Sequence, residues 1–123
     1  MSRPKNEVLL RRLKNRAALD ALFERGQVFR SKYLLLRFEE DPRASFLFAG
    51  VSVSKRNFKK AVDRNLIKRQ LREGLRAVKG QNLFFGNCIL IYTGKKSPKT
   101  SSLLEETTAL FLGLNKKIRP FLL

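Results

Sequence analysis

The first periodic pattern of apolar and polar residues along the chain predicts a helix over residues 16–25. Its apolar positions have the i, i+3, i+4 spacing of a helix with one buried face, at Leu19, Leu22 and Phe23. Asn15 can cap the first turn, and Gly26 stands where helices commonly stop. The residues before it, 1–12, are basic and aperiodic, and we expect them to form a mobile arm.

The next two segments, 27–40 and 45–54, have the period of two that is typical of strands. In the first, Leu34, Leu36 and Phe38 share one face, and Tyr33, Leu35 and Arg37 share the other. In the second, the face predicted to meet the core carries Leu47, Ala49, Val51 and Val53. Because only the turn "DPRA" separates the two segments, we expect them to pair as antiparallel neighbours.

The second half of the chain predicts a helix, a strand and a further helix. The first of these helices begins near residue 61 and gathers its apolar side chains on a narrow arc, at Ile67, Leu71, Leu75 and Val78. The run "CILIYTG", residues 88–94, is continuously apolar and predicts a strand buried on both faces. Residues 102–118 predict the last helix, whose stripe is Leu103, Leu104, Thr107, Leu110, Phe111 and Leu114.

The order of these elements, α-β-β-α-β-α, predicts an α+β sandwich in which helices pack on one sheet. A chain of 123 residues is long enough for one modest core, so we expect residues 1–123 to form a single domain.

The net charge of the chain indicates that the protein binds a polyanion. The 27 Lys and Arg residues against 10 Asp and Glu residues give a net charge of +17. The row of phosphates along a nucleic acid binds many cations at once, so nucleic acid is the leading candidate partner. An acidic membrane is the alternative. No apolar run reaches the length of a membrane span, and the N-terminal "MSRPKNEVLL" is a poor signal peptide. We expect a cytoplasmic protein without a membrane partner.

The scarcity of cysteine and histidine narrows the chemistry. A single Cys88 allows no intrachain disulfide, and the absence of histidine removes a Cys/His zinc set and a histidine base. Cys88 lies in an apolar run, where we expect an inert buried thiol. The consecutive acids at 39–41 precede a proline and predict a solvated turn rather than a metal site.

The helix near residue 61 places its cations on one side. Arg64, Lys68 and Arg72 follow one another at i, i+4 and i+8, where like charges repel. A solvated helix face is the plain alternative, but mixed signs would serve solubility better. The side bordering the apolar arc carries Arg64, Asn65, Lys68, Arg69, Arg72, Arg76 and Lys79, and we predict that it binds phosphates.

The stretch "FAGVSVSKR…AVDRNLIKRQLRE" resembles the signature of the bacterial ribonuclease P protein subunit. In that family a strand ending in V-S-K leads into a helix with the pattern R-N-x-x-K-R-x-x-R. The positions that match it are Arg64, Asn65, Lys68, Arg69 and Arg72. The resemblance extends over about residues 10–115 and includes "LKNRAALDALFERG" in the first helix.

The resemblance implies a mixed central sheet with a left-handed β-α-β crossover, the fold named after the second domain of ribosomal protein S5. It also implies that the protein is an accessory subunit of an endoribonuclease that removes the 5′ leader of precursor tRNA. In that family the RNA subunit is the catalyst and needs Mg²⁺, while the protein holds no firmly bound cofactor and supplies no catalytic residue. The expected partners are ribonuclease P RNA and precursor tRNA, with one protein per RNA.

The resemblance implies two binding surfaces. The one expected to bind the RNA subunit comprises Lys55, Arg56, Lys59, Lys60, Arg64, Asn65, Lys68, Arg69, Arg72 and Arg76. The one expected to bind the leader, in a cleft between the sheet and the first helix, comprises Phe23, Tyr33, Leu35, Arg37, Phe46, Phe48 and Ser52. For Phe23 and Phe46 a plain core position stays open. The chain departs from the family at Leu19, where many members have an aromatic residue, and in the connector, which lacks the usual glycine before Ala61.

Two other functions remain open at this point. A structural RNA-binding protein, such as a small ribosomal protein, would share the size, the charge and the architecture. A protein-only nuclease is disfavoured because the chain has no histidine and no clustered carboxylates.

Overall fold

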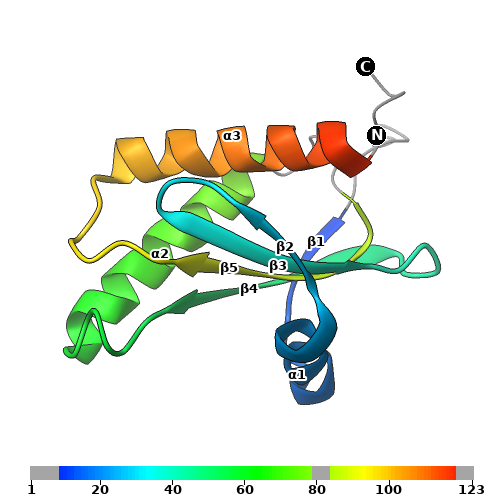
Figure 1. The fold of residues 1–123 in the computed structure, drawn as a ribbon, viewed down its shortest axis with the longest axis horizontal. Coiled ribbons are helices and arrows are strands. Elements are labelled where there is room, and N and C mark those ends of the chain that lie inside the picture. Colours follow the sequence, from blue (N-terminus) through cyan, green and yellow to red (C-terminus); the bar gives the residue numbers. More distant parts are fainter. Residues whose placement is uncertain (1–8, 79–83, 119–123) are drawn as a thin grey trace.

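The structure, a computed structural model, describes residues 9–78 and 84–118. Along the chain its elements are β1 (Leu9–Arg12), α1 (Arg16–Arg25), β2 (Gln27–Arg30), β3 (Leu34–Glu40), β4 (Phe46–Val53), α2 (Ala61–Val78), β5 (Gly86–Tyr92) and α3 (Thr100–Ile118). They form the predicted α+β fold, in which one mixed sheet carries helices on both sides (Figure 1).

The sheet has the strand order β1-β4-β5-β3-β2. The strands β1, β4 and β5 run parallel to one another, and β3 and β2 run antiparallel to their neighbours. The expected antiparallel pairing of β3 with β4 is therefore wrong, because β5 lies between them and hydrogen-bonds to both. The short turn at 41–44 joins two strands that are not neighbours. A strand apolar on both faces is most stable at the centre of a sheet, and β5 takes that place.

The N-terminal segment corrects a second expectation. Residues 9–12, predicted as part of a mobile arm, form β1 and pair in parallel with β4, with Leu10 opposite Leu47 and Arg12 opposite Ala49. The backbone N–H of Leu13 continues the ladder by donating to the Ala49 carbonyl at 3.0 Å. The rest of the predicted arm, residues 1–8, lies outside the described residues.

The predicted strand over 27–40 is two strands joined by a turn at 31–33. The backbone N–H of Ser31 donates to the Leu34 carbonyl at 2.9 Å and closes this turn. As a result β2 folds back antiparallel on β3, with Phe29 opposite Leu36.

The first helix has the predicted bounds and caps. The Asn15 side chain accepts from the Ala18 N–H at 3.2 Å, and the Gly26 N–H donates to the Leu22 carbonyl at 3.0 Å. Gly26 has extended backbone angles, φ −64° and ψ 145°. This position requires glycine because the backbone lies close to the end of the helix: a Cβ there would lie 2.5 Å from the Leu22 carbonyl oxygen.

The two long helices α2 and α3 cover one face of the sheet (Figure 1). The core between them contains the predicted faces of β3 and β4, with Val51 only half-buried, together with the buried arc of α2. Cys88 is fully buried in this core, as predicted, and burial raises the pKa of its thiol to about 12. Within α3, Leu103, Thr107, Leu110, Phe111 and Leu114 are buried as predicted, but Leu104 is exposed.

Close contact between α2 and α3 depends on Gly74. A Cβ at this position would lie 2.9 Å from the Thr107 hydroxyl, and that hydroxyl donates to the Leu103 carbonyl at 2.8 Å. Glycine and a small residue at the crossing let the two helix backbones approach each other and cover the sheet together.

On the opposite face of the sheet the described residues place one helix, α1, which buries Leu22 there (Figure 1). The parallel connection β4–α2–β5 is the β-α-β unit that the resemblance implied, and its left hand stays a prediction. In the described part of the chain, no helix has the length and apolar character to cross a membrane.

Candidate RNA-binding surfaces

The exposed side of α2 is the first candidate surface. Ile67, Leu71, Gly74, Leu75 and Val78 are buried, so the orientation of the helix is fixed. Of the residues predicted on this side, Arg64 and Lys68 are half-buried, and the exposed ones are Asn65, Arg69, Arg72 and Arg76. Lys79 lies outside the described residues. The structure thus brings the predicted positions together on one face, which points away from the core.

Arg64 has a structural task that the sequence did not indicate. Its guanidinium donates to the carbonyls of Phe58 and Lys59, both at 2.8 Å. These bonds hold the connector against the first turn of α2. Part of the hydrogen-bonding capacity of this arginine is therefore used within the protein.

The connector between β4 and α2 exposes its four predicted cations, Lys55, Arg56, Lys59 and Lys60. Its path is fixed without the family's glycine. Phe58 is buried with its ring 6.1 Å from that of Tyr92, its N–H donates to the Ser54 carbonyl, and the Asn57 amide donates to the Gly94 carbonyl at 3.3 Å. These contacts hold the connector, and with it the four cations, beside the first turn of α2.

The electrostatics of α2 leave these cations available. The ion pairs found among the described residues are Arg16–Asp20, Arg25–Glu39 and Arg43–Asp41, and none of them involves α2. Glu73, which is spaced to pair with Arg69 or Arg76, makes no ion pair there. A face of exposed cations without carboxylate partners is suited to a polyanion.

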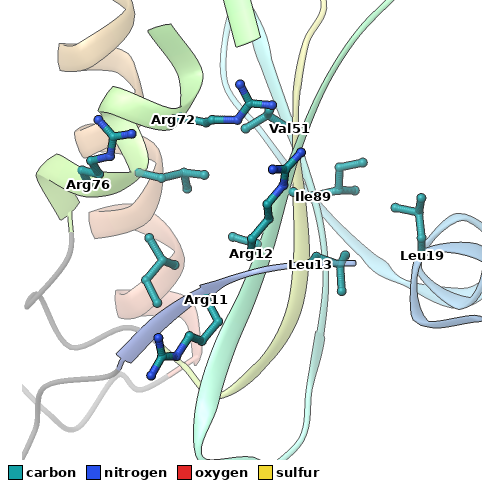
Figure 2. Close-up of a pocket in the computed structure, with 12 residues that line it drawn as sticks. Arg11, Arg12, Leu13, Leu19, Val51, Arg72, Arg76 and Ile89 are labelled. Atoms are coloured by element: carbon teal, nitrogen blue, oxygen red, sulfur yellow. The ribbon is translucent and has the colours of Figure 1, made fainter. Parts of the chain in front are cut away.

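A hollow of about 690 Å³ extends this face around the edge of the sheet, where β1 ends beside β4. Figure 2 shows Arg12 and Arg72 extending toward one another next to Val51, with Arg76 nearby on α2. Leu13, Leu19 and Ile89 line the apolar part of the same hollow. Arg12 is thus a candidate that the sequence analysis missed, because only the pairing of β1 with β4 brings it to α2.

The second candidate surface is the sheet face beside α1. Of the residues predicted there, Phe23 is 47% exposed on α1, and the Arg37 guanidinium lies 5.7 Å from the centroid of its ring. Phe46 and Phe48 are half-buried on β4, with their rings 5.9 Å apart edge to face. Neither Phe23 nor Phe46 is a buried core residue, which answers the alternative that the sequence left open.

The sheet register places the other predicted residues of this face in rows. Ser52 of β4 lies opposite Ile91 of β5, which in turn lies opposite Leu35 of β3. All three are half-buried. On the outer side, the Arg11 guanidinium lies 4.9 Å from the centroid of the Phe46 ring, a second contact that the sequence analysis missed. The face therefore combines aromatic rings, an apolar floor and arginines.

Tyr33 is not part of this face. It lies in the turn before β3, with its ring 6.4 Å from that of Tyr92, and its backbone N–H donates to the Glu106 carboxylate of α3 at 2.7 Å. The expectation that Tyr33 shares a face with Leu35 and Arg37 fails because the turn at 31–33 interrupts the strand alternation.

Metal-binding chemistry adds no further candidate. Within residues 9–78 and 84–118 no three His, Cys, Asp or Glu side chains form a group that could hold a metal ion.

Comparison with known proteins gives a family and a fold for this chain. The sequence model of the Ribonuclease P family matches residues 10–115. The ribonuclease P protein of Staphylococcus aureus has a similar structure, with a TM-score of 0.71 and 23% identity over 85% of this chain and 94% of that one. The ribonuclease P protein of Thermotoga maritima is also similar, with a TM-score of 0.69 and 24% identity over 81% and 94% of the two chains. No curated protein sequence matches.

Proposed function

The chain belongs to the Ribonuclease P family, and we propose that it is the protein subunit that binds the catalytic RNA and the 5′ leader of precursor tRNA. In this role it aids the endonucleolytic removal of the leader, which leaves the mature 5′ end of the tRNA. The observation that carries the proposal is the row of exposed α2 cations, Arg69, Arg72 and Arg76, none of which pairs with a carboxylate among the described residues.

The α2 face, the connector cations and Arg12 are the proposed binding surface for the RNA subunit. Each cation that neutralises a phosphate releases counterions from the RNA, and this release is a large part of the binding free energy. Arginine can also hold a phosphate through two parallel hydrogen bonds. Because the buried arc of α2 is packed against α3 and the sheet, these side chains project from a rigid support.

The sheet face beside α1 is the proposed binding surface for the leader. A single-stranded leader offers unstacked bases, and stacking on an aromatic ring tolerates any base. Phe23 offers an exposed ring, and Arg37 beside it can pair with the neighbouring phosphate. Recognition by stacking and charge suits leaders that differ in sequence from one tRNA to another.

In this proposal hydrolysis of the phosphodiester is the work of the RNA subunit with its Mg²⁺, and one protein per RNA supplies binding in the bacterial cytoplasm. Two RNA molecules that approach each other repel, and Mg²⁺ or protein cations can screen that repulsion. The net charge of +17 therefore predicts that the protein lowers the Mg²⁺ concentration that cleavage needs.

Purified protein added to a bacterial ribonuclease P RNA and precursor tRNA at low Mg²⁺ tests the proposal. We expect faster cleavage at the mature 5′ end and tighter binding of precursor than of mature tRNA. Absence of stimulation would favour a structural RNA-binding protein of the ribosomal type. Cleavage by the protein without RNA would instead indicate a protein nuclease.

A further inference from the structure

A second hollow, of about 650 Å³, lies on the α3 side of the sheet. Its walls are the turn before β3, the loop 93–99 and the first turns of α3, and its side chains include Tyr33, Tyr92 and Glu106. Figure 1 shows the turn between β2 and β3 beside α3, whereas α1 lies on the other side of the sheet. The hollow is therefore separate from the face proposed for the leader.

The floor of the hollow is rigid. Tyr92 is only 4% exposed, and its hydroxyl donates to the Lys96 carbonyl at 2.6 Å. A Cβ at Gly94 would collide with the Tyr92 ring, so glycine lets the loop fold over that ring. The Gln70 amide of α2 donates to the Pro98 carbonyl at 3.2 Å and to the Thr100 hydroxyl at 2.9 Å, which fixes the far end of the loop.

Tyr33 is held in place from both sides while its ring stays accessible. Its N–H donates to the Glu106 carboxylate, which also accepts from the Ser31 hydroxyl, and its carbonyl accepts from the Thr93 N–H at 2.8 Å. The side chain is nevertheless 43% exposed. A fixed backbone with an exposed ring is the arrangement that a stacking platform needs, because little entropy is lost when a base binds.

The charges around the ring are positive. Lys32, Lys95, Lys96 and Lys99 line the hollow and are exposed, against one carboxylate, that of Glu106, which already accepts two hydrogen bonds. The Lys32 ammonium lies 5.2 Å from the centroid of the Tyr33 ring. Within the described residues none of these lysines makes an ion pair.

We propose that this hollow is a second RNA site, which takes one nucleotide of single-stranded RNA with its base on Tyr33 and its phosphate among the lysines of loop 93–99. A base inside a duplex is already stacked and cannot lie on the ring, so the occupant is single-stranded. The volume suits one nucleotide, since sites for molecules of that size are commonly 300–1,000 Å³. The site deepens the proposed RNA-binding function and lies outside the family motif on α2.

Tyrosine fluorescence gives the site its own signal. The chain has two tyrosines and no tryptophan, and Tyr92 is buried, so Tyr33 is the tyrosine that a ligand can reach. We expect a short single-stranded RNA to quench the emission of the full-length protein. Tyr33→Ala should weaken binding at this site by about fivefold to 150-fold, the effect of one stacked base.

Tyr33→Phe is the matched variant, because it keeps the ring and removes the fluorophore. It should bind the RNA with unchanged affinity, measured by calorimetry, while the quenching disappears. If Tyr33→Ala binds with the affinity and the number of sites of the unchanged protein, or if Tyr33→Phe loses binding as Tyr33→Ala does, the proposal is wrong.

The lysines are tested by replacing Lys96 and Lys99 with glutamine. We expect weaker binding and a shallower dependence on salt, by about 0.7 log units per log unit of salt for each lost contact with a single strand. Lys116→Gln, at the other end of α3, removes the same charge away from the hollow and should leave the quenching titration unchanged. Equal effects of Lys96→Gln and Lys116→Gln would mean that the lysines attract RNA only through the overall charge of the protein. The proposed site would then be wrong.

The assembled ribonucleoprotein distinguishes the two sources of the nucleotide. If it comes from the RNA subunit, Tyr33→Ala weakens assembly and affects precursor and mature tRNA equally. If it comes from the leader, the loss is confined to precursor tRNA. If the Tyr33→Ala protein still stimulates cleavage, the proposed function is supported whatever the hollow does. The quenching titration then shows separately whether the hollow binds RNA.

Discussion

The two faces of the sheet are built from the same strands but are buried to different extents by the helices that cover them. On β3, Leu36 and Phe38 are buried under α2 and α3, while Leu35 and Arg37 alternate with them on the side of α1 and are half-buried. The covering helices explain the difference, because α2 and α3 have 18 and 19 residues and α1 has 10. A short helix leaves part of a sheet face uncovered, and the aromatic and basic residues there stay partly accessible.

Stability should depend on the covered face first. Phe38→Ala removes a ring that is 1% exposed and packs 5.4 Å from Phe84, so we expect a loss of about 3–5 kcal/mol in the free energy of unfolding. Phe48→Ala on the open face should cost less than half as much, because that ring is only half-buried. Urea unfolding of the two variants measures both, and equal losses would show that the open face is core as well.

Binding should depend on the open face instead. Phe23→Ala should weaken precursor tRNA binding by the ribonucleoprotein by about 1–3 kcal/mol, the effect of one stacked base, and leave mature tRNA unaffected. Leu112→Ala is the control, since Leu112 of α3 is also 47% exposed. A similar loss with both variants, or an equal loss for precursor and mature tRNA, would remove Phe23 from the leader site.

The sequence predicted what depends on neighbours along the chain. The bounds and caps of α1, the buried arc of α2 and the alternating faces of β3 and β4 follow from local periodicity, and the structure confirms them. The pairing of strands depends on tertiary contacts, so the position of β5 between β3 and β4 did not follow from the short turn joining the latter two.

The candidate sites divide in the same way. The α2 cations lie together because one helix carries them, whereas Arg12 reaches α2 only through the pairing of β1 with β4. The period of two predicts the wrong face for Tyr33, because the turn at 31–33 interrupts that period. The segment 27–40 contains no glycine or proline that would mark this turn.

The α2 surface should respond to salt rather than to the presence of a leader. Arg72→Gln should reduce the slope of log affinity for the RNA subunit against log salt by about 0.7–0.9, which corresponds to about a threefold smaller loss of affinity between 50 and 200 mM salt. Arg43→Gln is the control, because Arg43 is also an exposed arginine but lies in the turn between β3 and β4. An unchanged slope for Arg72→Gln would mean that this side of α2 faces solvent.

The smallest effect at neutral pH concerns Cys88 at the centre of the covered face. Burial raises the pKa of its thiol from 9.0 to about 12, so above pH 9 the unfolded chain releases a proton that the folded chain keeps. The thiol therefore contributes no pH dependence below pH 9, and its contribution to stability is lost as the pH rises from 9 toward 12. The loss should approach about 1.4 kcal/mol per pH unit.

Comparison with Cys88→Ala isolates this contribution from the tyrosines and lysines that titrate in the same range. The difference in free energy of unfolding between the two proteins should be constant from pH 6 to 8 and should shift in favour of the alanine variant above pH 9, as followed by urea unfolding. A constant difference up to pH 10.5 would mean that water reaches the thiol. In that case solvent would reach the sheet face under α2 and α3, and the two faces would differ less in burial than their packing indicates.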